Sequence, residues 1–222
     1  MGILVALIII SAWIIHLILS LVYLKVNFFD PFFYINIFIQ AYLFTGLFIT
    51  AHDSMHRTLS KNIKLNRLFG QLSTFLFACM SYNKLLKNHM HHHRYPGTEN
   101  DPDFSFVTQN FFLWWGLFLW RYTTILQIVL MGIIFNILKI WFNELNTLMF
   151  WVLPAFLSTL QLFFFGTYLP HKKPHIHNML PHNARTQKKN HVWAMLSCYF
   201  FGYHFEHHEN PGIPWWQLYR TK

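Results

Sequence analysis

Four long apolar segments constrain the fold more than any other feature of the sequence. They cover residues 3–24, 32–51, 122–142 and 146–169. The first has 22 residues, which as a helix would extend about 33 Å at roughly 1.5 Å per residue, enough for a hydrocarbon core of about 30 Å. These lengths predict an all-α integral membrane protein with four transmembrane helices.

The composition agrees with a lipid environment. Apolar residues make up 54% of the chain and charged residues only 11%, which is too few charges to cover a water-facing surface. The two cysteines, Cys79 and Cys198, form no CxxC pair, so a reducing or lipid-embedded setting is expected. The first apolar segment lacks a basic n-region and an A-x-A site, which favours a retained helix over a cleaved signal peptide.

Two polar regions, 51–110 and 170–222, hold most of the basic residues, with seven Lys and Arg in each. The positive-inside rule therefore places both regions and both termini in the cytoplasm, with the two hairpin tips outside. Within them, residues 68–82 and 192–203 are short and apolar and are expected to be interfacial, and residues 111–120 resemble an aromatic interface belt. We find no repeat or linker, so residues 1–222 are predicted to form a single domain.

The net charge of +9 is explained by Lys and Arg flanking membrane spans, where they meet anionic lipid headgroups. No basic run is interleaved with exposed aromatic residues, and no zinc-finger spacing is present. Binding to nucleic acid is therefore not expected.

Fifteen histidines are present, and eight of them fall into three groups. Residues at i, i+3 and i+4 of a helix lie on one face, with β-carbons about 5–6 Å apart. We therefore expect each HxxHH group to present three imidazoles to one point. Pro96 and Pro211 follow two of the groups, where a short helix would stop. The groups are His52 with His56, His89 with His92 and His93, and His204 with His207 and His208.

Such clustering indicates metal binding. Imidazole is a neutral ligand for zinc, copper, iron or nickel. Eight ligands exceed what one tetrahedral zinc ion needs, and they suit two ions with positions left open. A zinc hydrolase would carry an HExxH motif, which is absent. All three groups lie on the cytoplasmic side of a topology that was assigned from Lys and Arg alone, and this agreement supports the site independently.

The other histidines divide by position. His171 ends the fourth apolar segment and is predicted to be a ninth ligand, although His182 could complete the site in its place. His91 is expected to point away from its neighbours, and His16 to make a polar contact between helices. The loop histidines are His175, His177 and His191.

Acidic residues near these groups are few. Metal-bound imidazoles normally donate their second N–H to a carboxylate or a carbonyl. Asp53, and either Asp101 or Asp103, are candidates for that role. A turn or a helix cap explains the same aspartates equally well.

The sequence resembles the membrane fatty-acid desaturase/hydroxylase superfamily, and within it the bacterial-type carotenoid 4-ketolases. Arg57 departs from the pattern, because the ketolases usually have a small residue after their first box. Acyl desaturases usually have a longer first box, HxxxxH. The matching segments, which span Phe44 to Leu218, are FTGLFITAHDSMHR, NHMHHHRYPGTENDPDF, FFFGTYLPHKK, LPHNARTQ and CYFFGYHFEHHENPGIPWWQL.

The resemblance implies a non-haem di-iron centre that uses O₂ and an external electron donor such as ferredoxin. The implied ligands are His52, His56, His89, His92, His93, His171, His204, His207 and His208. The implied activity is introduction of a keto group at carbon 4 of the β-ionone ring of a carotenoid, in a bacterial inner membrane, with membrane lipid around the chain. The sequence specifies neither the oligomeric state nor whether hydroxylated rings are accepted.

Two alternatives stay open. A fatty-acyl desaturase or hydroxylase would use the same centre with a different tunnel. A membrane metal transporter would place its ligands along a path through the spans.

Overall fold

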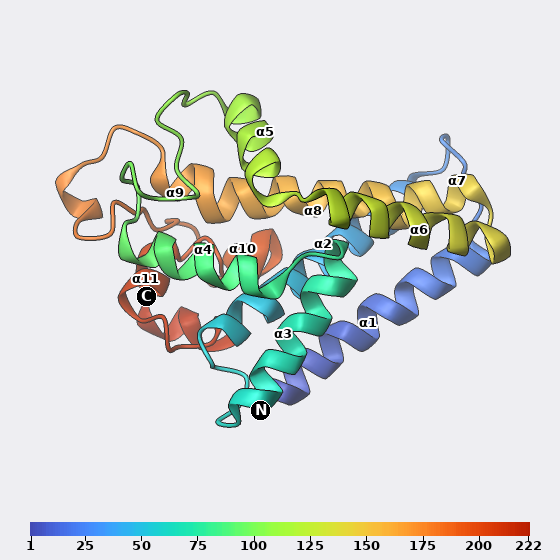
Figure 1. The fold of residues 1–222 in the computed structure, drawn as a ribbon, viewed down its shortest axis with the longest axis horizontal. Helices are drawn as coiled ribbons and strands as arrows, with labels where there is room; N and C mark the ends of the chain where they lie inside the picture. The colour runs from blue at the N-terminus through green and yellow to red at the C-terminus, as the bar shows by residue number, and fades with distance from the viewer.

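The computed structural model describes all of residues 1–222 and is entirely helical. Three helices are long and apolar enough to cross a membrane: α1 (Gly2–Tyr23), α2 (Pro31–Met55) and a composite helix, Glu144–His171. They match the predicted segments 3–24, 32–51 and 146–169. In Figure 1 these helices run along the long axis of the molecule, and α2 contacts both α1 and α8 (Leu153–Phe163). An integral membrane architecture is therefore supported.

Aromatic packing and one polar contact join α1 to α2. The ring of Trp13 meets Phe44 edge-on, with ring centroids 5.1 Å apart. His16 donates from Nδ1 to the side-chain oxygen of Gln40 over 2.6 Å. A buried polar group needs such a partner, so His16 has the helix-contact role expected of it.

The third apolar segment differs from the prediction. α5 (Phe111–Tyr122) and α6 (Ile125–Trp141) meet at an angle of 90°. Thr123 is extended, and the Thr124 hydroxyl accepts from the backbone N–H of Gln127, so the chain leaves one helix and caps the next. Tyr122 thus ends α5, and the predicted span 122–142 corresponds to α6, which begins three residues later and has 17 residues. The structure does not confirm that this segment is a span of its own. Taken together, the bent pair could form a fourth span.

The composite helix contains two π-helical turns. α7 (Glu144–Thr147) leads into the first, Leu148–Val152, and α8 leads into the second, Phe164–Tyr168, before α9 (Leu169–His171). Pro154 and Pro170 lie two residues after these π turns. Proline lacks the N–H that an α-helix needs, and a local widening accommodates that loss. His171 is the last residue of this helix.

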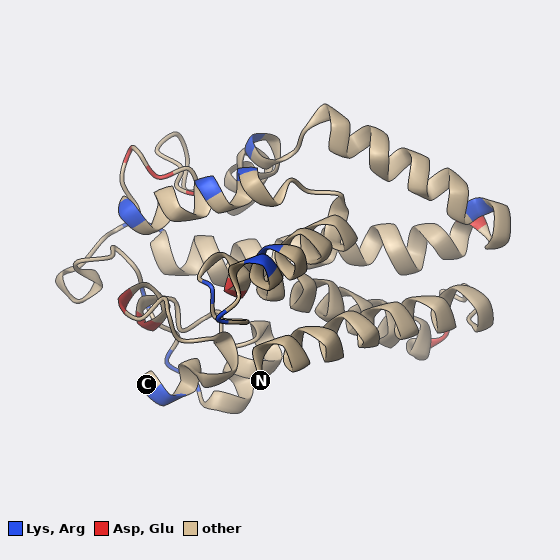
Figure 2. Ribbon diagram, turned by 60° about the horizontal axis from the view of Figure 1, so that its bottom comes forward, with Lys and Arg blue, Asp and Glu red and all other residues tan.

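The remaining helices form a cap at one end of the bundle. In Figure 1, α4, α10 and α11 lie around the ends of α2 and α9. Figure 2 shows that Lys and Arg gather over the same half of the molecule. The cap consists of α3 (Ile63–Ala78), α4 (Tyr82–Arg94), the 3-10 turn His177–Met179, α10 (His191–Cys198), α11 (His204–Glu209) and the 3-10 helix Trp215–Thr221.

The two HxxHH groups lie on helices, as the spacing predicted, and His52 lies in α2, whereas His56 is the residue directly after that helix ends. α4 ends at Arg94, two residues before Pro96, and α11 ends at Glu209, two residues before Pro211. The expected helical stops are therefore confirmed.

Candidate metal centre

Nine histidines converge in the cap, in two adjacent groups. Within each group the ligand nitrogens all lie within 4.8 Å of one another. The nine are the eight predicted box histidines together with His171. The five-histidine group contains His52, His56, His89, His93 and His207, and the four-histidine group contains His92, His171, His204 and His208.

The five-histidine group brings its Nε2 atoms together. Those of His52 and His207 are 3.1 Å apart, and those of His93 and His207 are 3.0 Å apart. The Nε2 atoms of His56 and His89 are 2.6 Å apart. Lone pairs that face each other repel unless a cation lies between them. Two nitrogens bound at right angles to one ion, each at about 2.1 Å, would be about 3 Å apart.

The four-histidine group has a similar arrangement around His208. Its Nε2 lies 3.1 Å from the Nε2 of His92 and 3.1 Å from that of His204. His171 is buried, and its Nε2 has no hydrogen-bond partner. A buried polar atom without a partner is unfavourable, and a metal ion would satisfy this one. The donor set fits a second ion.

Each HxxHH group divides its histidines between the two groups, contrary to our expectation of a single focus. His89 and His93, at i and i+4, share the five-histidine group, whereas His92, at i+3, belongs to the other. On α11, His204 and His208 share one group and His207 lies in the other. At about 100° per residue, i+3 and i+4 lie on opposite sides of residue i, so adjacent histidines point to different groups.

Hydrogen bonds on the outer nitrogens orient two of the imidazoles. His92 donates from Nδ1 to both carboxylate oxygens of Asp101, at 2.9 and 3.0 Å. His171 donates from Nδ1 to the backbone carbonyl of Asn183 at 3.0 Å. Each bond fixes the tautomer that leaves Nε2 free as a ligand. Asp101 accepts from an imidazole and also stabilises a turn, the two roles considered for it. Its carboxylate accepts from the backbone N–H of Gly97 at 2.7 Å in the turn after α4.

Gly97 is required in that turn. Its φ of +66° lies in the left-handed region, and a Cβ there would come within 2.9 Å of the Asn183 side chain. The PGT sequence after the second box thus lets the chain return to place Asp101 against His92.

The other two candidate aspartates, Asp53 and Asp103, lie farther from an imidazole nitrogen than Asp101 does. Asp53 accepts from the backbone N–H of Trp215 at 3.0 Å and lies 3.5 Å from Nδ1 of His52. It therefore ties α2 to the C-terminal 3-10 helix. Asp103 lies 3.8 Å from Nδ1 of His92 and accepts a hydrogen bond from the Tyr122 hydroxyl.

Burial sets the protonation of the cap. It lowers the pKa of His204, His207 and His208 well below the usual range, so these imidazoles are neutral. Burial also lowers the pKa of His92, but Asp101 and Asp103 outweigh it and raise that pKa to about 8. Burial raises the pKa of Asp103 to about 6. Neutral imidazoles have the free lone pair that a metal needs, and His92 would lose a proton when a metal binds.

The remaining histidines lie outside both groups. His182 donates to Glu209 at 2.7 Å, and its ring stacks at 5.5 Å from His208. His91 is exposed, as its position predicted. His171, and not His182, contributes a nitrogen to the four-histidine group.

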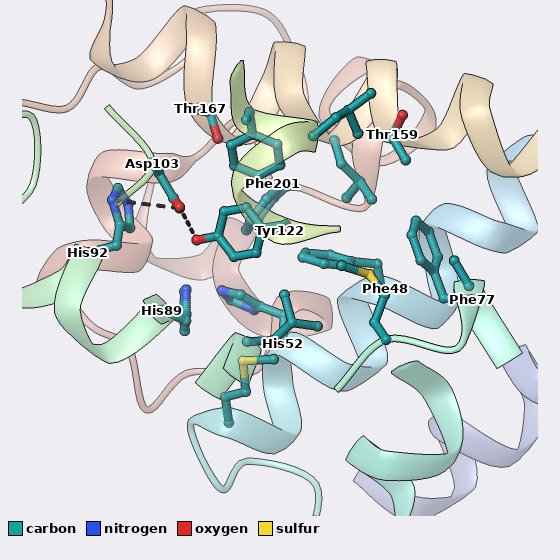
Figure 3. Close-up of a pocket in the computed structure, with 18 of the residues that line it drawn as sticks. Phe48, His52, Phe77, His89, His92, Asp103, Tyr122, Thr159, Thr167 and Phe201 are labelled. Atoms are coloured by element: carbon teal, nitrogen blue, oxygen red, sulfur yellow. Dashed lines mark hydrogen bonds and ion pairs between the residues drawn. The ribbon is translucent and has the colours of Figure 1, made fainter. Parts of the chain in front are cut away.

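An apolar pocket leads to the two groups. His52 and His89 of one group and His92 and His204 of the other are among its lining residues. Phe48 and Phe77 lie farther from His92 in Figure 3. The sequence did not identify this lining, because its residues come from helices far apart in the chain.

Gly166 makes room for part of the pocket wall. A Cβ at Gly166 would lie 2.2 Å from the Phe201 ring. Only glycine allows the Phe201 ring to come this close. In the sequence, the signal for this contact is the single Gly in the aromatic segment FFFGTY.

A family model described as fatty acid desaturase matches residues 29–139 and 119–222. The chain belongs to the fatty acid desaturase family. Among its relatives, a beta-carotene ketolase of Paracoccus sp. (strain PC1) is 38% identical over 189 residues, covering 82% of this chain and 76% of the relative. A zeaxanthin 4-ketolase of Chlamydomonas reinhardtii is 38% identical over 186 residues, covering 82% of this chain and 42% of the relative. No solved structure matches. The resemblance to ketolases of this desaturase family is confirmed.

In this desaturase-family chain, His171 gives a direct test of the four-histidine group. Replacing it in His171→Ala removes one of four nitrogens, so we expect metal content to fall from two ions per chain toward one. Activity should fall more than tenfold, since loss of an outer hydrogen bond alone typically costs 10–100-fold. Metal analysis of the purified protein measures the first effect.

His182→Ala is the matched control, because His182 touches the same ring of His208 from outside the groups. It should keep nearly two ions. A fully active His171→Ala protein with full metal content would mean that the box histidines alone complete the site.

Proposed function

We propose that this protein is a membrane di-iron oxygenase that introduces a keto group at carbon 4 of the β-ionone ring of β-carotene-type carotenoids. The observation that carries the proposal is the apolar pocket whose lining includes histidines of both groups. The names of the ketolase relatives support the substrate class. A long polyene is apolar and suits such a pocket.

The reaction consists of two hydroxylations at one carbon. Each replaces a C–H with a C–OH, consumes one O₂, two electrons and two protons, and releases one water. The resulting gem-diol loses water to give the ketone. The electrons come from an external carrier protein such as ferredoxin. Two bound iron ions would supply the activation of O₂.

The residues of the chain hold and orient this chemistry. The nine histidines provide the ligands, while Asp101 and the Asn183 carbonyl fix the tautomers of His92 and His171. Phe48, Phe77 and the other apolar side chains exclude water and align the ring with the centre.

The proposed topology has four spans, with the bent α5–α6 pair as one of them. Both termini and the metal centre would lie in the cytoplasm, because Lys and Arg gather at that end of the molecule. A transporter is less well supported, since both groups lie together in the cap.

Expression in a bacterial host that makes β-carotene tests the proposal. We expect 4-keto carotenoids to appear, with a colour shift and no change in fatty acids. Chromatography of the pigments and of the fatty acid methyl esters measures both. New acyl unsaturation with unchanged pigments would instead establish the fatty-acyl alternative.

A further inference from the structure

One hydrogen-bonded polar pair, Tyr122 and Asp103, lies beside the histidines in the mainly apolar pocket. Tyr122 and Asp103 both line the pocket, and the Tyr122 hydroxyl donates to the Asp103 carboxylate. That carboxylate lies 3.8 Å from Nδ1 of His92. Figure 3 shows the pair between His92 and the aromatic part of the pocket. Its position is next to the place where a substrate carbon would be oxidised.

The unsubstituted substrate needs no hydrogen-bond partner in the pocket, whereas the hydroxylated intermediate needs one. A β-ionone ring has no polar atom, whereas the product of a first hydroxylation carries one hydroxyl. A hydroxyl buried without a partner is unfavourable, so an entirely apolar pocket would favour release of the singly hydroxylated ring. Forming the ketone requires the same carbon to stay at the centre for a second oxidation.

Tyr122 can accept a hydrogen bond from that hydroxyl. The phenol donates its single proton to Asp103, and the Asn88 side chain also hydrogen-bonds to it, while the phenol oxygen can accept from one further donor. Thr159 and Thr167 also line the pocket, and a threonine hydroxyl can accept in the same way. The Thr159 hydroxyl donates to the Phe156 carbonyl in its own helix at 2.7 Å. In Figure 3 Thr159 lies on the side away from His92.

The fold holds Tyr122 firmly in place. It is the last residue of α5, directly before the 90° break, and it is buried. Its ring packs on Phe118 with centroids 4.6 Å apart. The break between α5 and α6 thus sets a rigid phenol at the pocket wall.

We propose that Tyr122, held by Asp103, binds the hydroxyl of the 4-hydroxy intermediate and retains that ring for its second oxidation. This inference rests on the proposed ketolase function. Tyr122 is a positioning residue for the intermediate and contributes little to the first hydroxylation.

The test is Tyr122→Phe in the β-carotene-making host, with the ratio of 4-hydroxy to 4-keto end groups as the readout. The substitution keeps the ring and removes only the hydroxyl. We expect the ratio to rise roughly three- to tenfold, the factor expected for the loss of one hydrogen bond. A purely structural role would lower both products together.

Tyr82→Phe is the matched control. Tyr82 is a buried tyrosine of the same small apolar cluster, and its hydroxyl bonds to Ser54 outside the pocket. It should leave the ratio of 4-hydroxy to 4-keto products unchanged. An unchanged ratio in Tyr122→Phe, with ketone still formed, would overturn the role of Tyr122 and leave the ketolase function intact.

The unaltered protein gives a second measurement that does not depend on the folding of a variant. Supplied with equal amounts of 4-hydroxylated and unsubstituted rings, it should consume the hydroxylated ring faster. Slower use of the hydroxylated ring would contradict retention. Absence of both 4-hydroxy and 4-keto products from the unaltered protein would reject the ketolase function itself.

Discussion

His92→Ala is expected to abolish ketone formation while the protein remains in the membrane. Both ring nitrogens of His92 make contacts in the site. Its Nε2 lies 3.1 Å from that of His208, and its Nδ1 donates to Asp101. Alanine would remove one ligand of the four-histidine group and leave a buried carboxylate without its partner, which is costly. Pigment chromatography, with membrane protein quantified in parallel, measures the loss.

His91→Ala is the control, because His91 is the adjacent residue on α4 and is exposed. It should retain most of the activity. Equal losses in the two variants would indicate that α4 had misfolded and that the ligand assignment had not been tested.

Local spacing predicted much of this arrangement. The apolar segments predicted α1, α2 and the composite helix to within a few residues, because lipid exposure demands uninterrupted apolar length. The i, i+3 and i+4 spacing identified all eight box histidines, and the end of the last apolar segment identified His171.

The features of the site that spacing could not predict depend on how segments far apart in the sequence pack together. Helical periodicity makes His92 and His93 point in different directions, but which histidines each of them meets depends on where α2 and α11 lie relative to α4. The Asp101 contact with His92 depends on the turn at Gly97, where a positive φ brings the chain back.

The 90° angle between α5 and α6 could not be predicted for a related reason. Hydropathy placed the start of the third span at Tyr122, whereas Tyr122 ends α5 and α6 begins at Ile125. Thr123 and Thr124 separate the two helices by local capping, and the resulting angle places Tyr122 in the pocket wall. The signal in the sequence was a pair of β-branched residues, the second of which is a good N-cap.

Removal of metal is expected to have the second large effect, a complete and reversible loss of activity. Within each group, imidazole nitrogens face each other at 2.6 to 3.1 Å, an arrangement that a bound cation would stabilise. Chelation of the purified protein should abolish ketone formation, and Fe²⁺ with a reductant should restore it. Zn²⁺ should occupy the site without restoring activity, because imidazole sites accept zinc readily and zinc undergoes no redox change.

Activity restored by Zn²⁺ as well as by Fe²⁺ would contradict an oxygenase mechanism. Activity that survives exhaustive chelation, in protein shown to be free of metal, would exclude a metal-dependent reaction altogether.

The most direct measurement for the central claim is the number of iron ions bound per chain in fully active protein. The two histidine groups, with five and four ligands, predict a ratio of two. Elemental analysis combined with amino acid quantification would give it, on protein whose ketone formation has been measured in the same preparation. A ratio of two supports one ion in each group. A ratio of one or zero at full activity would contradict the account.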